Sequence, residues 1–189
     1  MLKSLVMKFP ILVMLSTVLV APQFAAAEKR SLVHAEFLAD VSAIVPGKPF
    51  TVGVMFKIER GWHIYWSDPG DAGLATTIEF KLPEGFKATV VQYPTPVKFV
   101  QPGDIVGYGY HDEVMLLATI TPPKDLPAGK SIDIAAVASW LCCEKVCVPG
   151  EAKLNITLPV SNESSPANQS IFETWKSKLP STTQPTNQE

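Results

Sequence analysis

The sequence predicts an antiparallel β-sandwich, and three observations support this fold class. Short runs rich in β-branched and aromatic residues recur along the chain from Glu36 onward. Pro and Gly clusters such as Pro46-Gly47 and Pro102-Gly103 interrupt these runs at short intervals. No helix of useful length fits between the interruptions. The expected strands cover residues 50–56, 76–80, 89–93, 114–121, 132–141 and 152–158.

The segment before these strands predicts a cleaved signal peptide. Lys3 and Lys8 precede a mostly apolar run from Phe9 to Ala21, and three consecutive alanines ending at Ala27 form a cleavage site. We expect cleavage after Ala27 and export to the periplasm. Stable membrane insertion is not expected, because the apolar run is too short to cross about 30 Å of hydrocarbon. Cleavage leaves 162 of the 189 residues and changes the net charge from -2 to -4.

The composition indicates one ordinary domain and excludes nucleic acid as a partner. With 47% hydrophobic and 18% charged residues, the chain suits a single packed core rather than a two-domain enzyme. The 16 Lys and Arg residues nearly balance the 18 Asp and Glu residues, and no basic run provides the footprint that nucleic acid needs. We therefore divide the chain into a signal peptide (1–27), a sandwich domain (28–160) and a polar tail (161–189).

The tail is rich in Ser, Asn, Gln, Thr and Pro. Within it, Ile171, Phe172, Trp175 and Leu179 recur at helical spacing and predict one short amphipathic helix before a disordered end. Such a helix either covers an edge of the sandwich or docks a partner. A single apolar stripe favours the first interpretation.

The three cysteines, Cys142, Cys143 and Cys147, lie close together near the end of the expected sandwich. In an exported protein, such cysteines form disulfides, which persist in oxidising compartments. A structural disulfide usually closes a long loop, whereas a bond from Cys143 to Cys147 closes only a few residues. The short loop favours redox chemistry, because an accessible bond of this kind suits electron transfer.

Strand alternation assigns different environments to the adjacent cysteines. Six residues that share one face of the expected strand are all apolar or small: Ile132, Ile134, Ala136, Ala138, Trp140 and Cys142. This is the expected core face, so Cys142 is expected to be a small buried hydrophobe while Cys143 points the other way. Cys143 and Cys147 are then the candidate redox pair. Three intervening residues let their Cα atoms approach within the roughly 4.4 to 6.8 Å that a disulfide requires.

Two other interpretations of these residues remain open. An inert disulfide that only holds a hairpin together would leave a non-redox interaction module. Alternatively, the chain is a periplasmic copper-binding protein, in which Cys143 and Cys147 hold Cu(I) together with His63, His111 or a Met. No compact run of His and Cys supports a metal site, so we expect neither a metal nor another cofactor.

Three motifs occur in order along the chain. They are the segment 61–73 (GWHIYWSDPGDAG), the segment 107–110 (GYGY), and Trp140-Leu141 followed by Cys143-x-x-x-Cys147-Val148-Pro149. Together they resemble the N-terminal periplasmic domain of DsbD, in its ScsB-type branch, over about residues 34 to 160. The resemblance implies an immunoglobulin-like sandwich. It also implies a thiol–disulfide relay, in which a membrane domain reduces the N-terminal domain, which in turn reduces thioredoxin-like periplasmic proteins.

Carried over by position, the resemblance makes Cys143 and Cys147 the redox pair and Cys147 the cysteine that faces partners. It implies a component of a protein-disulfide reductase and connects the domain with cytochrome c biogenesis. The family often has an apolar residue where this chain has Cys142, which agrees with a buried position but leaves Cys142 as an alternative partner for Cys147. No membrane domain follows in this sequence, so we expect the electron donor to be a separate membrane-embedded DsbD-like protein.

The resemblance further implies a cap loop that shields the disulfide until a partner docks. The matching segment is 103–111, in which Asp104, Tyr108 and Tyr110 are the candidate cap residues. Glycines in this segment allow movement, and tyrosine rings are suited to cover the sulfur atoms. An ordinary aromatic hairpin is the alternative.

The aromatic segment 61–73 is also divided by strand alternation. Trp62 and Ile64 alternate with His63 and Tyr65, so we expect one pair to enter the core while the other stays accessible. A lone His among aromatic residues is more often a structural hydrogen-bonding residue than a base or a ligand, and we assign His63 this role. Stacking on a sugar is the alternative for the aromatic run.

Overall fold

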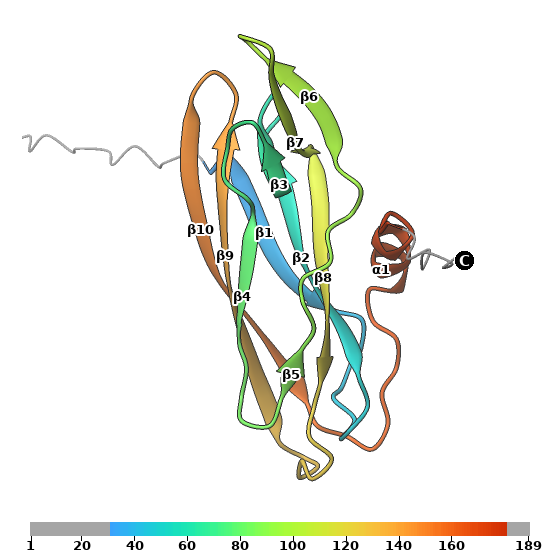
Figure 1. The fold of residues 1–189 in the computed structure, drawn as a ribbon. Helices are drawn as coiled ribbons and strands as arrows, with labels where there is room; N and C mark the ends of the chain where they lie inside the picture. Colours follow the sequence, from blue (N-terminus) through green and yellow to red (C-terminus); the bar gives the residue numbers. More distant parts are fainter. Residues whose placement is uncertain (1–30, 181–189) are drawn as a thin grey trace, which may run out of the picture. The chain divides into compact units, whose positions relative to one another are not determined.

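The computed structural model describes residues 31–180, which form two antiparallel β-sheets and one short helix (Figure 1). The elements in chain order are β1 (Val33–Ala39), β2 (Phe50–Ile58), β3 (His63–Gly70), β4 (Thr77–Lys81), β5 (Lys87–Ala88), β6 (Val97–Gln101), β7 (Ile105–His111), β8 (Glu113–Thr121), β9 (Ser131–Cys143), β10 (Cys147–Pro159) and α1 (Gln169–Lys176). The expected signal peptide, its cleavage after Ala27 and the last residues of the tail lie outside the described residues.

The smaller sheet has four strands in the order β1-β2-β8-β5. Alternate side chains of β2, including Val52, Val54 and Phe56, are fully buried in the core. The Phe56 ring meets the ring of Trp140 from β9 edge-on, with 5.6 Å between the ring centroids. Burial of each such side chain contributes about 1.5–3 kcal/mol, so this contact helps to hold the two sheets together.

The larger sheet follows the order β10-β9-β3-β7-β6, and β4 also pairs with β9. Strands β9 and β10 form a long hairpin of 13 residues on each side. The predicted core face of β9 is confirmed, because Ile134, Ala136, Ala138 and Cys142 are buried in the core and Trp140 packs partly against it. The tips of the β9–β10 and β6–β7 hairpins lie at the same end of the sandwich, at the top of Figure 1.

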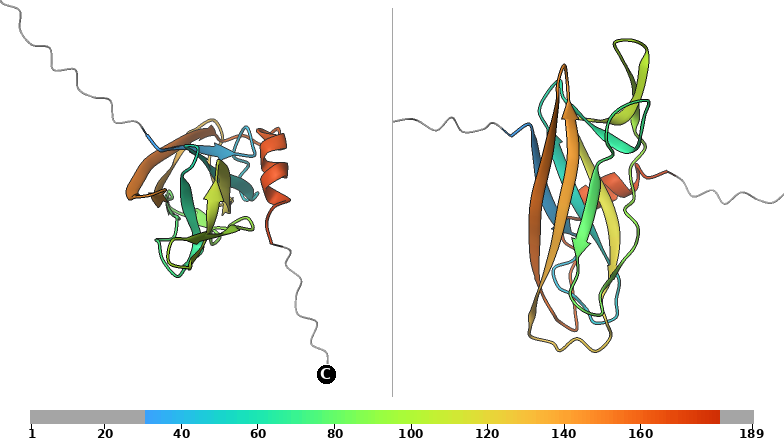
Figure 2. Two further views of the ribbon diagram at one scale, coloured as in Figure 1. Left: turned by 90° about the horizontal axis from the view of Figure 1, so that it is seen from above. Right: turned by 60° about the vertical axis from the view of Figure 1, so that its left-hand side comes forward.

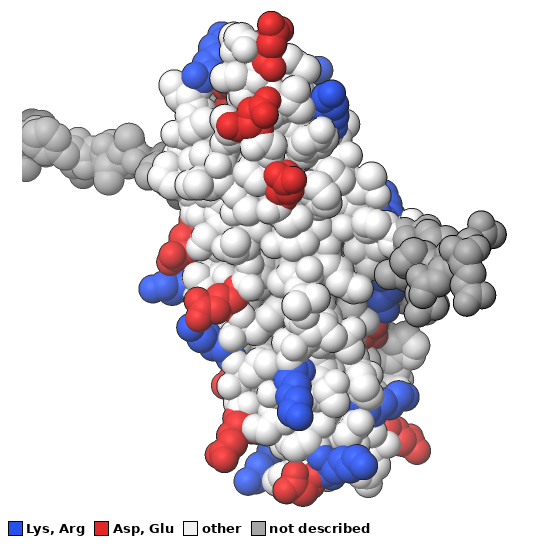
Figure 3. All heavy atoms as spheres, viewed as in Figure 1, with Lys and Arg blue, Asp and Glu red and all other residues white. Residues whose placement is uncertain are grey.

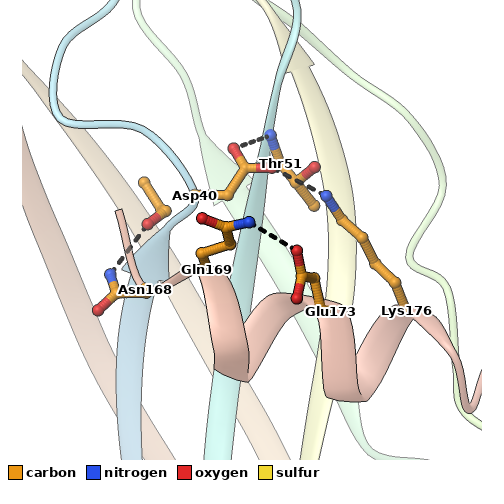
Figure 4. A network of polar contacts seen from close by, with 7 residues as sticks. Asp40, Thr51, Asn168, Gln169, Glu173 and Lys176 are labelled. Atoms are coloured by element: carbon orange, nitrogen blue, oxygen red, sulfur yellow. Dashed lines mark hydrogen bonds and ion pairs between the residues drawn. The ribbon is translucent and has the colours of Figure 1, made fainter. Parts of the chain in front are cut away.

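Helix α1 lies on the outer side of the four-stranded sheet (Figure 2). Its apolar side chains Phe172 and Trp175 are buried, and Trp175 lines a groove together with Met55 of β2. Nζ of Lys176 pairs with Oδ2 of Asp40 at 2.9 Å, which ties the helix to the end of β1 (Figure 4). The predicted helix is therefore confirmed, and it covers the sandwich.

The segment 89–93 does not form the expected strand. Pairing in this region is limited to β5 and to an isolated bridge between Gln92 and Leu117. Pro94 and Pro96 follow at once, and proline has no N–H to donate to a sheet. The segment instead runs irregularly along the edge of β8. Strands β1, β3, β5, β6 and β7 lie outside the six expected strand ranges.

Together these elements form an immunoglobulin-like antiparallel β-sandwich with a short C-terminal helix, as predicted. Within residues 31–180, no helix combines the length and apolar character needed to cross a membrane. On the face shown in Figure 3, acidic and basic side chains are interspersed and form no continuous basic patch. That face gives no support for an electrostatic nucleic-acid site.

Candidate redox site

The β9–β10 hairpin positions two of the three cysteines. Cys143 is the last residue of β9 and Cys147 is the first residue of β10, and the two are direct cross-strand partners. The three residues between them form a tight turn, in which the N–H of Glu144 donates to the carbonyl of Val146 at 3.1 Å. A disulfide joins Cys143 to Cys147, with 4.2 Å between the Cα atoms. The predicted pairing is therefore present.

The two ends of this disulfide differ in their exposure. Cys143 is only 1% exposed, and at this point β9 lies between β10 and β3. Cys147 is exposed, since β10 is the edge strand of the sheet. Cys143 does point away from the core face, as predicted, yet it is buried on the outer face of the sheet. Of the two cysteines, Cys147 is therefore the one exposed toward a protein partner.

Cys142 is a free thiol on the opposite face of β9. It is 1% exposed and lies in the hydrophobic core, with Ile64 and Val148 as its cross-strand neighbours. Burial raises the pKa of the Cys142 thiol to about 11, because the apolar core disfavours the charged thiolate. The thiol therefore stays protonated at neutral pH, and it is a poor nucleophile. Its predicted role as a buried hydrophobe agrees with this environment.

A cluster of aromatic rings lies beside Cys143 on the outer face of the larger sheet. His63 of β3 is the cross-strand partner of both Cys143 and His111, so the three residues form one row across three strands. The His63 ring lies 4.4 Å from the Phe99 ring of β6 and 5.1 Å from the Tyr65 ring, centroid to centroid. His63 and Tyr65 are 6% and 1% exposed. The prediction that one of the two alternating pairs stays accessible is wrong, because Ile64 is in the core and the β6–β7 hairpin lies over His63 and Tyr65.

Two residues of β6 make this cover, and sequence reasoning missed both. Phe99 packs on His63, and a Cβ atom at Gly107 of β7 would collide with the Phe99 ring, so the glycine allows this close approach. Nε2 of Gln101 lies 3.4 Å from Nε2 of His63 and donates to Oη of Tyr65 at 3.2 Å. The alternation of β6 was the available signal, since Phe99 and Gln101 share one face of Val97–Gln101.

His63 is neutral at physiological pH. Its pKa is lowered from 6.5 to about 4, mainly because burial disfavours the charged ring and secondarily because His111 lies nearby. The exposed His111 makes a different contact, in which Nδ1 donates to the carbonyl of Trp62 at 3.2 Å. The structural hydrogen-bonding role predicted for His63 thus has a partner, Gln101.

The three candidate cap residues do not lie together with the disulfide. Asp104 lies in the exposed turn between β6 and β7. Tyr110 is in the core, where its hydroxyl donates to the carbonyl of Pro94 at 2.7 Å. Tyr108 shares that face of β7, and its ring packs against Trp66. The tyrosines cannot cover the sulfur atoms from there, because strand alternation directs them away from the row that holds Cys143.

The structure gives no support for the copper alternative. Among residues 31–180, no group of three or more His, Cys, Asp or Glu side chains is arranged to hold a metal ion. His63 and His111 lie in one row with Cys143, but each ring nitrogen that contacts a neighbour contacts an amide or a carbonyl group.

The chain is similar to known proteins in sequence and in fold. The family model for the N-terminal part of the thiol:disulfide interchange protein DsbD matches residues 29–159. The N-terminal periplasmic domain of ScsB from Proteus mirabilis is a similar solved structure, with 18% sequence identity and a TM-score of 0.60. That match covers 82% of this chain and 57% of the other, so the chain spans little more than half the length of that relative.

A second similar structure is the reduced DsbD N-terminal domain of Neisseria meningitidis, with 16% identity and a TM-score of 0.36 over 70% of this chain and 90% of that one. Comparison with curated proteins finds no match. The ScsB likeness shows that the sandwich fold is shared.

Proposed function

The chain belongs to the family of DsbD N-terminal domains, and from this premise we propose that it relays two electrons through the Cys143–Cys147 disulfide. The observation that carries the proposal is the unequal exposure of the two cysteine residues. Cys147 is open on an edge strand, while Cys143 is buried beside it. This arrangement suits an exchange in which one cysteine meets the partner and the other resolves the mixed disulfide.

The exchange is an ordinary thiol–disulfide displacement. A thiolate of a reduced partner attacks Sγ of Cys147, a new S–S bond forms, and the electron pair of the broken bond passes to Sγ of Cys143. The second thiol of the partner then displaces Cys147, so the partner leaves oxidised and this chain holds two reduced cysteines. In the opposite direction, Cys147 attacks an oxidised partner and Cys143 resolves the mixed disulfide. Each direction transfers two electrons and two protons.

The partners in this proposal are thioredoxin-like proteins of the periplasm and a membrane-embedded DsbD-like electron donor. The edge position of Cys147 supports protein partners, since within residues 31–180 no strand pairs with β10 on its outer side. The exposed side chain of Val146, next to Cys147 in the turn, offers apolar surface for contact. No cofactor is needed, because the partner supplies both electrons.

The test is electron transfer from a defined partner. Oxidised protein is mixed with a reduced thioredoxin-like protein, the reaction is quenched with acid, and the free thiols are alkylated and counted by mass spectrometry. The relay predicts that Cys143 and Cys147 gain two alkyl groups while the partner loses two thiols. A Cys142→Ala variant, which keeps the disulfide, serves as the control and should behave like the wild type. If the disulfide stays intact after prolonged incubation, the relay fails and the non-redox module takes its place.

A further inference from the structure

The proposed exchange leaves a problem at Cys143, which has to carry a negative charge in a buried position. When the disulfide opens at Cys147, the electron pair goes to the sulfur of Cys143, which is 1% exposed. Burial alone disfavours a thiolate, as the raised pKa of the equally buried Cys142 shows. A hydrogen-bond donor beside Cys143 would offset this cost.

His63 is the side chain placed to supply such a donor. It lies directly opposite Cys143 on the neighbouring strand β3, on the same face of the sheet. The Cβ atoms of directly opposite residues are about 4.5–5.5 Å apart, which brings an imidazole within reach of a sulfur atom. On the other side of Cys143, its cross-strand neighbour is Cys147 itself.

Gln101 determines which nitrogen of His63 carries the proton. Nε2 of Gln101 can only donate, and it lies 3.4 Å from Nε2 of His63. Nε2 of the neutral ring must therefore accept, so the proton lies on Nδ1. The same amide also donates to Oη of Tyr65 at 3.2 Å, which holds the Gln101 side chain in place. The N–H of the neutral His63 ring is therefore at Nδ1, where it makes no hydrogen bond to Gln101.

We infer that Nδ1–H of His63 donates a hydrogen bond to the Cys143 thiolate when the disulfide opens, and that Gln101 is the positioning residue that maintains this tautomer. The inference rests on the proposed exchange at Cys143 and Cys147. No proton is transferred in this step. The attacking thiolate forms a bond to Sγ of Cys147, the S–S bond breaks, and the electron pair remains on Cys143 until solvent supplies a proton.

An intact disulfide sulfur accepts hydrogen bonds only weakly, so this interaction belongs to the opened state. The titratable groups that face His63 are Cys143 of β9, Tyr65 of its own strand and His111 of β7, while Phe99 and Gln101 of β6 carry no charge. His63 thus lies directly opposite Cys143 on this face, stays uncharged at neutral pH and keeps a ring proton.

The experiment measures two properties that a purely structural residue would not change. The first is the pKa of Cys143 in the reduced protein, obtained from the pH dependence of its alkylation. The second is the rate at which dithiothreitol reduces the oxidised protein. In His63→Phe, which keeps an aromatic ring against Phe99, we expect a higher pKa for Cys143. We also expect reduction slower by about 10- to 100-fold, the equivalent of one hydrogen bond to a charged group.

Three further variants make the result specific. His63→Asn places an amide N–H near the position of Nδ1 and should restore part of the rate, whereas His63→Gln places it near Nε2 and should not. Gln101→Leu should slow reduction less than His63→Phe. It allows the ring proton of His63 to move to Nε2, but it leaves the imidazole ring in place. His111→Phe is the matched control, since it removes the neighbouring histidine of the same row and should leave the rate unchanged.

The inference is overturned if His63→Phe leaves both the pKa of Cys143 and the reduction rate unchanged, or if His111→Phe has an equal effect. If the phenylalanine variant does not fold, the contrast between His63→Asn and His63→Gln decides, and equal rates in these two contradict the inference. Dithiothreitol is a small reductant, so this result is independent of protein partners. Failure of electron transfer from a thioredoxin-like protein would overturn the relay alone.

Discussion

Cys142 and Cys143 are adjacent in the sequence and equally buried, yet they belong to different chemical environments. Cys142 lies among apolar side chains of the core, between Ile64 and Val148. Cys143 lies on the other face of β9, between His63 and its disulfide partner Cys147. If the proposed exchange takes place at Cys143, burial does not by itself make a cysteine inert. The polar groups around the sulfur and the exposure of its partner decide whether it can take part in exchange.

The same division extends across the neighbouring strands. On the core side, Ile64 and Tyr110 continue the row of Cys142, and both are buried. On the outer side, His63 and His111 continue the row of Cys143. The row on the core face of the larger sheet is thus buried in the core, whereas the row on the outer face is polar and titratable. Changes on the core side should affect mainly stability, and changes on the outer side should affect mainly reactivity.

The largest predicted contrast is in the alkylation of the reduced protein. Cys142 should react at least about 1,000-fold more slowly than Cys147, because its sulfur becomes accessible only when the core opens, at a cost of several kcal/mol. Mass spectrometry after timed addition of iodoacetamide measures both rates. In denaturant the two cysteines should become equally reactive. Rapid alkylation of Cys142 in the folded protein would remove the distinction between the two faces.

The second contrast concerns two aromatic residues of the β6–β7 hairpin. Tyr110→Ala removes a buried core ring and should lower the free energy of unfolding by about 3–5 kcal/mol. Phe99 is only half-buried, so Phe99→Ala should cost less. Urea denaturation measures both changes. Under conditions in which both variants are folded, Tyr110→Ala should leave the rate of disulfide reduction unchanged. Faster reduction of the disulfide in Tyr110→Ala would show that Tyr110 does shield the disulfide as a cap residue.

The third contrast is electrostatic and uses Phe99→Ala again. Burial is the main cause of the low pKa of His63, and Phe99 packs directly on its ring. Removing the Phe99 ring should raise the pKa of His63 from about 4 toward 6.5, as followed by NMR titration of the imidazole protons. Tyr108→Ala, on the other face of β7, is the control and should leave this pKa unchanged. Equal shifts of the His63 pKa in both variants would mean that the packing of the whole β6–β7 hairpin, rather than the Phe99 ring alone, lowers this pKa.

The smallest predicted effect is on stability as a function of pH. The unfolded chain protonates His63 below about pH 6.5, whereas the folded protein does so only below about pH 4. The unfolded state binds more protons between these values, so the free energy of unfolding should fall as the pH decreases from about 6.5 to about 4. Thermal denaturation should show that this decrease is smaller in His63→Asn than in the wild type. Identical pH profiles would contradict the burial of a neutral His63.

Much of the fold followed from local patterns, whereas the burial around the disulfide did not. Alternation along residues 132–142 predicted which side of β9 faces the core and which cysteines pair. The burial of His63 depends instead on the β6–β7 hairpin, whose Gln101 contacts His63 across 38 positions of sequence. Alternation along β6 places Phe99 and Gln101 on one face, but it does not predict which distant strand that face meets. The tyrosines in that hairpin attracted the cap prediction, although the alternation that works for β9 places Tyr110 in the core.

The most direct test of the account is covalent trapping with single-cysteine replacements. With Cys147 as the exposed sulfur, Cys143→Ser keeps the attacking cysteine and removes the resolving one. This variant should therefore accumulate a mixed disulfide with an oxidised thioredoxin-like protein on a non-reducing gel, and mass spectrometry should map the bond to Cys147. Cys147→Ser should accumulate little, because its remaining sulfur at Cys143 is buried. The opposite pattern would show that the buried sulfur meets the partner, and it would contradict the account.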